Sequence, residues 1–219
     1  MTRLVRTATF FVACAALLGV AAAHAGVVNP GSCIIGASHI SLVGAYAAAS
    51  DPANAADSVD SQAKLTITVR DISLNPIAGI PVVLDFSGCT ADTKIKATQS
   101  YHAQTASCAT ATVQGFTTTN GTVSFVVIGG RSTTAGHSNG CAQVYADSYL
   151  LGSIGVATFD SNNDGVMNLT DVSAFWADNG TSRDRSDVTG DGTVNLTDVS
   201  NAWAANSHAF NLGGASLCP

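Results

Sequence analysis

Apolar and polar residues alternate with a period of two in several short segments between residues 34 and 159. In the segment KLTITVR, the apolar Leu65, Ile67 and Val69 fall on one face. Two later segments, IPVVLDF and TVSFVVI, repeat the pattern with Ile80, Val82, Leu84 and Phe86, and with Val123, Phe125 and Val127. Successive side chains of a strand point to opposite faces, so this pattern predicts strands that bury one face. The turn-forming segments NPIAG and TNG separate the strands, and together these features predict an antiparallel β-sandwich.

Three stretches of this region, RDISLNPIAGIPVVLDF, TTTNGTVSFVV and CAQVYADSYLLGSIGV, carry a family resemblance. They are similar to bacterial immunoglobulin-like domains of the invasin/intimin type. The resemblance covers residues 63–159 and implies an immunoglobulin-like sandwich that acts as a spacer or an adhesive module. This implication is an analogy of fold, because one fold serves many functions.

The first 25 residues have the pattern of an export signal. Arg3 and Arg6 precede the apolar run TATFFVACAALLGVAAA, and Ala23-His24-Ala25 then offers small residues that flank a cleavage point before Gly26. This pattern predicts a secretory signal peptide, residues 1–25, that is cleaved before Gly26. Two alternatives stay open. The run is about as long as a membrane anchor requires, and Cys14 is a candidate site for lipid attachment.

Export would place the remaining cysteines in an oxidising compartment, where cysteines usually pair. Removal of the signal peptide leaves Cys33, Cys89, Cys108, Cys141 and Cys218. Because five is an odd number, one cysteine should be free or bonded elsewhere. A Cys89–Cys108 bridge would close a polar segment, and a Cys33–Cys218 bridge would join the two ends of the mature chain. The sequence alone leaves the pairing open.

The acidic residues gather near the C-terminus. All fifteen are Asp, and eight lie in residues 160–198, where Arg183 and Arg185 are the basic residues. Loss of Arg3 and Arg6 with the signal peptide changes the formal charge from −6 to −8. Nucleic acid requires a basic face, so we expect no nucleic-acid partner. A local excess of carboxylates instead favours a cation.

Two twelve-residue segments of the acidic region, DSNNDGVMNLTD and DVTGDGTVNLTD, share one pattern and start 27 positions apart, at Asp160 and Asp187. Aligned with a calcium loop, both have oxygen donors at positions 1, 3, 5, 7, 9 and 12, and Gly at position 6. The donors of the first loop are Asp160, Asn162, Asp164, the Val166 carbonyl, Asn168 and Asp171. Those of the second are Asp187, Thr189, Asp191, the Thr193 carbonyl, Asn195 and Asp198. We therefore expect two Ca²⁺ ions, with the first loop binding more tightly because the Asn162 amide oxygen is a better ligand than the Thr189 hydroxyl.

The doubled pattern D-x-N-x-D-G-x-x-N-x-x-D resembles the type I dockerin family. The resemblance covers residues 159–205 and implies paired loop–helix units that bind calcium and dock to a cohesin-like protein. This chain departs from the family in the short segment between the loops and in Thr189. The same residues also fit helix caps, with Asn168 and Asn195 as N-caps and Asp171 and Asp198 in the first turn. The two interpretations are compatible.

The repeat continues into the segments that follow each loop, where DVSAFWA aligns with DVSNAWA. Trp176 and Trp203 therefore hold equivalent positions. One interpretation places Val172, Trp176, Val199 and Trp203 in a small core between two helices. A second makes one Trp an exposed interaction anchor. A third packs the helix faces against the sandwich, which would make the pair an intramolecular brace.

Catalytic motifs are lacking in this sequence. The four histidines of the mature chain are scattered, and a glycosidase pair of two Glu residues is excluded because the chain contains no Glu. We therefore expect a non-enzymatic protein with no catalytic residues.

These observations predict a mostly β chain in four parts. Residues 1–25 are the signal peptide, 26–159 an immunoglobulin-like antiparallel β-sandwich, 160–205 a small helical dockerin-like calcium module, and 206–219 a tail. We expect the mature protein to have no transmembrane segment and to be secreted, either extracellular or at the cell surface. The expected function is a binding, adhesion or assembly module that presents a calcium-clamped surface to a protein partner. Two alternatives are a self-assembling subunit of an extracellular structure and a cohesin-docked accessory of polysaccharide degradation.

Overall fold

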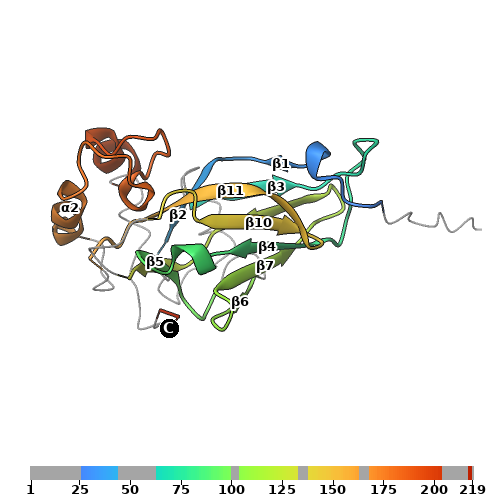
Figure 1. Cartoon of the computed structure of the whole chain (residues 1–219), viewed down its shortest axis with the longest axis horizontal. Coiled ribbons are helices and arrows are strands. Elements are labelled where there is room, and N and C mark those ends of the chain that lie inside the picture. Colours follow the sequence, from blue (N-terminus) through green and yellow to red (C-terminus); the bar gives the residue numbers. More distant parts are fainter. Residues whose placement is uncertain are drawn as a thin grey trace, which may run out of the picture.

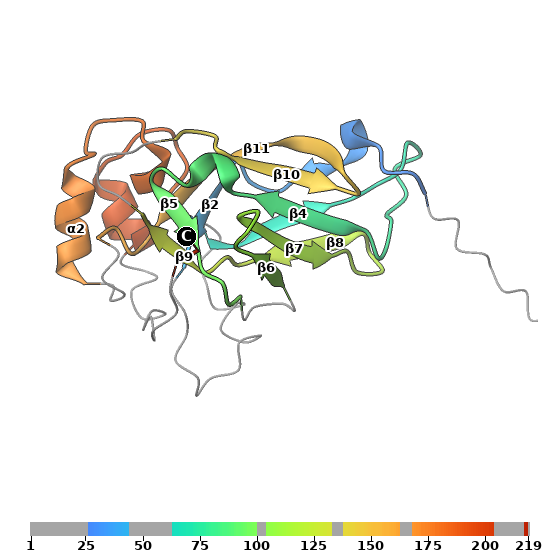
Figure 2. The ribbon, with the colours of Figure 1, turned by 60° about the horizontal axis from the view of Figure 1, so that its bottom comes forward.

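The computed structural model describes residues 26–43, 63–99, 104–132, 138–162, 168–203 and 217–218, with only the backbone described for 201–203. The predicted signal peptide lies outside the described residues. The described chain is mostly β, and its strands form an elongated body with the short helices of the C-terminal part beyond one end (Figure 1). A second view shows the same arrangement (Figure 2).

The described strands form three sheets. The first has the strand order β1 (Ile34–Ile35), β3 (Leu65–Thr68), β8 (Thr122–Phe125). The second has the order β2 (His39–Leu42), β11 (Tyr149–Thr158), β10 (Ala142–Ala146), β4 (Pro81–Asp85), β7 (Thr112–Phe116), β6 (Thr105–Ser107). The third pairs β5 (Thr93–Ile95) with β9 (Gly129–Arg131). Short helical turns lie at η1 (Pro30–Ser32), η3 (Ser87–Cys89) and η4 (Asp184–Ser186).

The strand pairs are antiparallel except for β2 and β11, which run parallel. The sequence predicted a purely antiparallel sandwich, and this pair departs from it. β2 and β11 are not joined by a hairpin, since most of the sandwich lies between them in the chain, and a long connection permits parallel pairing.

The two larger sheets bury a common apolar core. Its members include every inward residue predicted for the three alternating segments except Ile80, which is partly buried: Leu65, Ile67, Val69, Val82, Leu84, Phe86, Val123, Phe125 and Val127. The sheets approach closely at Gly115 of β7, where an added Cβ would lie 3.0 Å from Val123 and 3.3 Å from Phe125. The described residues thus form a β-rich sandwich, as expected, while the invasin/intimin-type resemblance stays a prediction.

Two disulfides join Cys89 to Cys141 and Cys108 to Cys218, and Cys33 is free. The prediction of one odd cysteine is confirmed, but both bridges considered from the sequence are wrong. Cys89 follows β4 and Cys141 precedes β10, and these ends meet because β4 and β10 are paired strands. The Cys218 amide donates to the Ile95 carbonyl at 2.8 Å, which returns the end of the chain to the sandwich. Two disulfides indicate an oxidising environment.

The C-terminal part contains the helix α2 (Leu169–Trp176) after the first loop and the shorter helical segment η5 (Asp198–Trp203), of the wider π type, after the second. Both follow a predicted loop, but they differ in geometry, so the symmetric helix pair of a dockerin stays a prediction. Within the described ranges, no helix is long and apolar enough to cross a membrane.

Candidate metal centre

The second loop, residues 187–198, turns around the carboxylate of Asp187. The Oδ1 atom accepts hydrogen bonds from the backbone amides of Gly190 (2.8 Å) and Asp191 (3.2 Å), and Oδ2 accepts one from Gly192 (2.7 Å). The amides converge because Gly190 and Gly192 adopt φ angles of 71° and 89°, a region that favours glycine. Asp187 is buried. The loop therefore encloses a negative charge.

Asp198 occupies the last position of the same loop and is fully buried. Its Oδ1 accepts hydrogen bonds from the Thr189 amide (2.9 Å) and the Thr189 hydroxyl (3.0 Å), and its Oδ2 accepts one from the Asn195 amide (2.9 Å). The Thr189 hydroxyl also lies 3.4 Å from Oδ1 of Asp187. A hydroxyl has one proton and donates to one oxygen at a time. Two carboxylates thus share one donor, and a cation would relieve the repulsion between them.

The described part of the first loop holds its last carboxylate in the same way. Oδ1 of Asp171 accepts a hydrogen bond from the Asn162 amide (3.2 Å), and Oδ2 accepts one from the Asn168 amide (2.7 Å). These donors lie at loop positions 3 and 9, as Thr189 and Asn195 do in the second loop. The hydrogen bonds to the last carboxylate of each segment therefore recur 27 residues apart in the described part of the chain.

The predicted ligands of the second loop are only partly brought together. Asp187, Thr189 and Asp198 converge, whereas Asp191 is exposed and its Oδ1 accepts a hydrogen bond from the Thr193 amide (2.9 Å). In the described part of the chain, no three Asp, His or Cys side chains form a group that could hold a metal ion. Asp164 and Val166 of the first loop lie outside the described residues.

The helix-cap interpretation of the repeated Asn-x-x-Asp is confirmed for the first loop. Asn168 is the N-cap of α2, its Oδ1 accepts a hydrogen bond from the Thr170 amide (2.7 Å), and Asp171 completes the capping box. In the second loop, Oδ1 of Asn195 accepts the equivalent hydrogen bond from the Thr197 amide (2.8 Å). Capping and metal binding remain compatible, because a carboxylate or amide oxygen has two lone pairs.

The donor set of the second loop fits calcium in its chemistry. Carboxylates, a hydroxyl, an amide oxygen and a carbonyl are the hard ligands that Ca²⁺ takes, at variable distances and numbers. Two of the carboxylates, those of Asp187 and Asp198, already face one interior. The exposed Asp191 would have to turn inward to complete the set.

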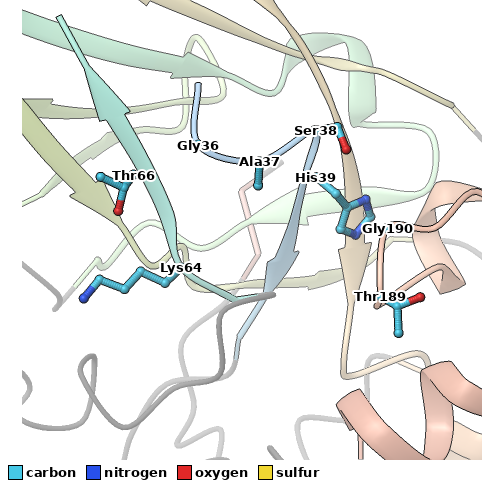
Figure 3. A pocket seen from close by; sticks show the side chains of 8 residues that line it. All are labelled: Gly36, Ala37, Ser38, His39, Lys64, Thr66, Thr189 and Gly190. Carbon is cyan, nitrogen blue, oxygen red and sulfur yellow. The ribbon is translucent and has the colours of Figure 1, made fainter. Parts of the chain in front are cut away.

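His39, at the start of β2, packs directly against the second loop. An added Cβ on Gly190 would lie 2.8 Å from the Cβ of His39, so glycine is required by close approach as well as by its φ angle. Burial lowers the pKa of His39 to about 4, against the opposing effect of Asp184 and Asp198. The imidazole is therefore neutral at pH 7. A hollow of about 400 Å³ lies beside it, lined by the β1–β2 connection, the start of β3 and the second loop (Figure 3).

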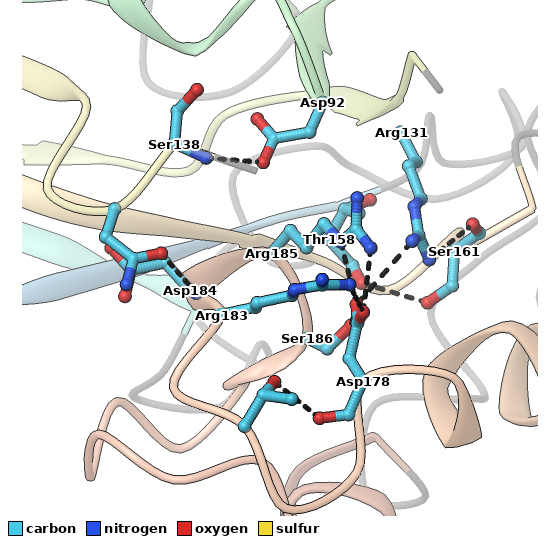
Figure 4. A network of polar contacts seen from close by, with 12 residues as sticks. Asp92, Arg131, Ser138, Thr158, Ser161, Asp178, Arg183, Asp184, Arg185 and Ser186 are labelled. Carbon is cyan, nitrogen blue, oxygen red and sulfur yellow. Dashed lines mark hydrogen bonds and ion pairs between the residues drawn. The ribbon is translucent and has the colours of Figure 1, made fainter. Parts of the chain in front are cut away.

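A buried ionic cluster centred on Asp178 joins the loops to the sandwich (Figure 4). Asp178 is fully buried and accepts hydrogen bonds from Arg185 Nε (2.7 Å) and Nη2 (2.7 Å), from Arg183 Nη1 (2.6 Å) and from the Ser186 hydroxyl (2.7 Å). Arg131 Nη2, from β9 of the sandwich, lies 3.6 Å from Oδ2. Burial by itself would raise the pKa of Asp178, but the hydrogen bonds from Arg185, Ser186 and Arg183 outweigh it and lower the pKa to about 2.

Arg131 and Asp92 extend this cluster within the sandwich. The Arg131 amide donates to the Asp160 carbonyl (3.3 Å), and its Nη1 donates to the Ser161 carbonyl (3.2 Å), which anchors the start of the first loop. Oδ2 of Asp92 accepts a hydrogen bond from the Ser138 amide (2.8 Å). Burial raises the pKa of Asp92, while Ser138 and the neighbouring arginines act against that increase.

Further contacts at the junction involve the β9–β10 connection. Oδ2 of Asp184 accepts a hydrogen bond from the Gly140 amide (2.6 Å), and the Asp184 amide donates to Oδ1 of Asn139 (3.2 Å). Asn139 Nδ2 donates to the Ser182 carbonyl (2.6 Å). The C-terminal part is thus fixed to the sandwich by residues between the two loops. Sequence reasoning missed this junction, although two arginines in an acidic segment were a signal for a buried carboxylate.

The exposure of the side chains in the repeat shows which face of α2 is accessible to solvent. Phe175 is buried, whereas Trp176 is 48% exposed. The interpretation that placed Trp176 in a small core is wrong, because Phe175 takes the buried position next to it. The side chain of Trp203 lies outside the described residues. Leu169 and Leu196, at equivalent positions of the repeat, are 80% and 61% exposed.

Comparison with known proteins gave no match: no family model matches the chain, and no curated protein or solved structure matches it.

Proposed function

We propose that this chain is a secreted, non-enzymatic calcium-binding protein that presents an interaction surface to a protein partner. The observation that carries the proposal is the convergence of Asp187 and Asp198 on the single hydroxyl of Thr189. Two carboxylates this close are stabilised by a cation. The hydrogen bonds to the last carboxylate of the loop recur 27 residues earlier, at Asp171, which supports a second ion.

The proposed ligands are those expected from the sequence. In the second loop they are Asp187, Thr189, Asp191, the Thr193 carbonyl, Asn195 and Asp198. In the first loop they are Asp160, Asn162, Asp164, the Val166 carbonyl, Asn168 and Asp171. Calcium would supply positive charge and cross-linking to a part of the chain that has little apolar core of its own.

The chain's own residues support a structural role for this metal. Asp178, with its arginines, holds the segment between the loops on the sandwich. Calcium in the loops would then order the segments on either side of that anchor. The result is a rigid end of the molecule, which suits recognition because little conformational freedom remains to be lost on binding.

The proposed recognition surface consists of Leu169, Trp176 and Leu196, all exposed. Large apolar side chains in water favour burial against a partner. Leu169 and Leu196 follow the capping Asn168 and Asn195, so the geometry of each leucine depends directly on the loop before it. Calcium and partner binding are therefore proposed to be coupled.

Self-assembly is a second candidate, and a specific observation favours it. The segment 70–76 lies at the end of the sandwich opposite the C-terminal part (Figure 1) and exposes Ile72 (81%) and Leu74 (60%), while Phe116 (60%) is exposed where β7 ends. A body with different apolar surfaces at its two ends can associate head to tail, which forms open chains unless the rotation closes.

Native mass spectrometry of the purified chain, with and without calcium, separates these proposals. We expect bound calcium in both cases, a monomer for the first candidate and a concentration-dependent ladder of copies for the second. Partner capture from the extracellular fraction of the producing organism should require calcium and should be lost in Trp176→Ala and Leu196→Ala. Leu150→Ala, an exposed leucine of β11, is the matched control. A chain that takes up no calcium, or that hydrolyses a substrate, would contradict the proposal.

A further inference from the structure

The outer face of the six-stranded sheet carries two neighbouring rows of mainly polar side chains. In β10, β4 and β7, which lie side by side in Figure 1, every second residue is buried in the core, as Val144, Leu84 and Val113 are. The residues between them therefore point outward. The strand register aligns one row of Tyr145, Val83 and Gln114 and a second row of Gln143, Asp85 and Thr112.

A hollow of about 420 Å³ lies on this outer face, a size typical of sites for small molecules. β4, β7, β10 and the β10–β11 turn supply its described lining residues, which are Pro81, Val83, Asp85, Gln114, Tyr145 and Ser148. The backbones of these strands are already paired on both sides, because β11 lies beside β10 and β6 beside β7. A peptide therefore cannot add to the sheet as a strand here, and a ligand in the hollow contacts side chains.

Polar groups in and beside the hollow keep hydrogen-bonding capacity for a ligand. The Tyr145 hydroxyl donates to Oε1 of Gln143 (2.5 Å), which leaves the Nε2 group of Gln143 as a donor. Oδ1 of Asp85 accepts a hydrogen bond from the Ser87 amide (2.8 Å), which leaves Oδ2 as an acceptor. Gln114 adds a second amide, which can both donate and accept. The site thus offers both kinds of group next to the apolar ring of Tyr145.

The charge of the hollow excludes several classes of ligand. Among its described lining residues, Asp85 is the only charged side chain, so an anionic ligand would meet repulsion with no cation to offset it. A metal ion would find a single carboxylate, one oxygen of which already accepts the Ser87 amide. A wholly apolar ligand would remove water from Asp85 and Gln114 without replacing its hydrogen bonds. The remaining class is a neutral ligand rich in hydroxyl groups.

We infer that this hollow is a carbohydrate-binding site, with a neutral sugar ring stacked on Tyr145 and its hydroxyls hydrogen-bonded to Gln114 and Asp85. A sugar ring has C–H groups on its faces, which pack against an aromatic ring, and hydroxyls at its edge, which donate and accept. Neighbouring strands lie about 4.8 Å apart, so the row from Tyr145 to Gln114 spans about 10 Å, enough for more than one linked sugar. This activity goes beyond the proposed function and is independent of calcium, because the described lining residues belong to the sandwich.

Nuclear magnetic resonance titration of the full chain with linear oligosaccharides tests the inference. The neutral probes are oligomers of glucose, xylose, mannose and N-acetylglucosamine, and an oligogalacturonate is the acidic comparison. At least one neutral probe should shift the backbone amide signals of Val83, Gln114 and Tyr145, equally with and without a calcium chelator. The oligogalacturonate should shift these signals less at the same concentration, because Asp85 repels it.

Variants of the hollow should weaken the binding of the same probe. Tyr145→Ala should raise its dissociation constant at least about tenfold, since the stacking surface is lost. Tyr145→Phe should bind more tightly than Tyr145→Ala because the ring remains, and Gln114→Ala should bind more weakly than the wild type. Tyr149→Ala is the matched control and should leave binding unchanged, because Tyr149 is an exposed tyrosine of β11 that is not among the described lining residues.

Several results would overturn the inference. These are no shift of the three amide signals with any neutral probe, a preference for the oligogalacturonate, an equal loss in Tyr149→Ala, or a loss of binding in chelator. Shifts of the same signals with protein concentration alone would assign this face to a second copy of the chain. If Tyr145→Ala fails to fold, as judged by its circular dichroism, Gln114→Ala and the map of shifted signals still decide. Calcium uptake is measured separately, so failure of the carbohydrate site leaves the proposed function standing.

Discussion

Replacement of Asp178 by Asn should destabilise the C-terminal part of the chain by about 3 kcal/mol at pH 7. Asp178 is fully buried and is hydrogen-bonded to Arg183, Arg185 and Ser186. Removal of one partner from a buried ion pair costs about 3–5 kcal/mol, because the remaining charge is left uncompensated. Asn has the same shape and keeps one acceptor oxygen, which places the expected loss at the lower end.

The difference in stability between the wild type and Asp178→Asn should depend on pH. The pKa of Asp178 is lowered from 3.8 to about 2 by its hydrogen bonds. A carboxyl group with a lowered pKa in the folded state stabilises that state above its unfolded pKa, and the stabilisation is lost as the pH falls through the folded value. The shift corresponds to about 2 kcal/mol. The stability difference between the wild type and Asp178→Asn should therefore be constant above about pH 5 and shrink from about pH 4 to pH 2.

Urea unfolding monitored by tryptophan fluorescence measures both effects, because Trp176 and Trp203 both lie in the C-terminal part. The control is Asp147→Asn, an exposed residue with a φ angle of 47°, which Asn tolerates well. A loss below about 1 kcal/mol for Asp178→Asn, or a difference that does not change with pH, would show that the cluster does not hold the junction together.

Three further changes test other parts of the structure. Phe175→Ala should lower the free energy of unfolding by about 3 kcal/mol, and Trp176→Ala by less than half of that, because Phe175 is buried and Trp176 is half-exposed. Equal losses would contradict the assignment of Phe175 to the buried face of α2 and Trp176 to the exposed face. Gly190→Ala should lower the melting temperature and weaken calcium binding. The added Cβ would lie 2.8 Å from His39, and the φ angle of 71° disfavours alanine. An unchanged melting temperature would count against this packing. Among the five cysteines from Cys33 to Cys218, only Cys33 should react with an alkylating agent in the unreduced, denatured chain, as peptide mapping by mass spectrometry would show. Protection of Cys33 would mean that it is bonded.

The sandwich was largely predictable from the sequence because strand periodicity is a local signal. Leu65, Ile67 and Phe125 were assigned to the inward face from alternation alone, and all three are buried. The parallel pairing of β2 with β11 was not predictable, since it depends on which distant strands meet. The prediction of the disulfide pairing was wrong for the same reason. Cys89 pairs with Cys141 because β4 and β10 are neighbouring strands, not because the two cysteines are near in sequence.

The repeat of the two loops was predictable from the sequence, but the residues that the fold packs around each loop were not. The matched hydrogen bonds to Asp171 and Asp198 follow from residues that occur twice, 27 positions apart. The junction around Asp178 consists of tertiary contacts, and no local pattern reports them. A ligand ranking based only on Asn162 and Thr189 therefore omits the groups that the fold packs against the second loop, such as His39.

The most direct test of the account is amide hydrogen exchange of the full chain with and without calcium. Calcium should slow exchange in residues 187–198, most of all at the amides of Thr189, Gly190 and Gly192, which donate to the two converging carboxylates. The strands of the sandwich should exchange at the same rate in both conditions. Unchanged exchange across residues 187–198 at saturating calcium would contradict the claim that this loop is a calcium site.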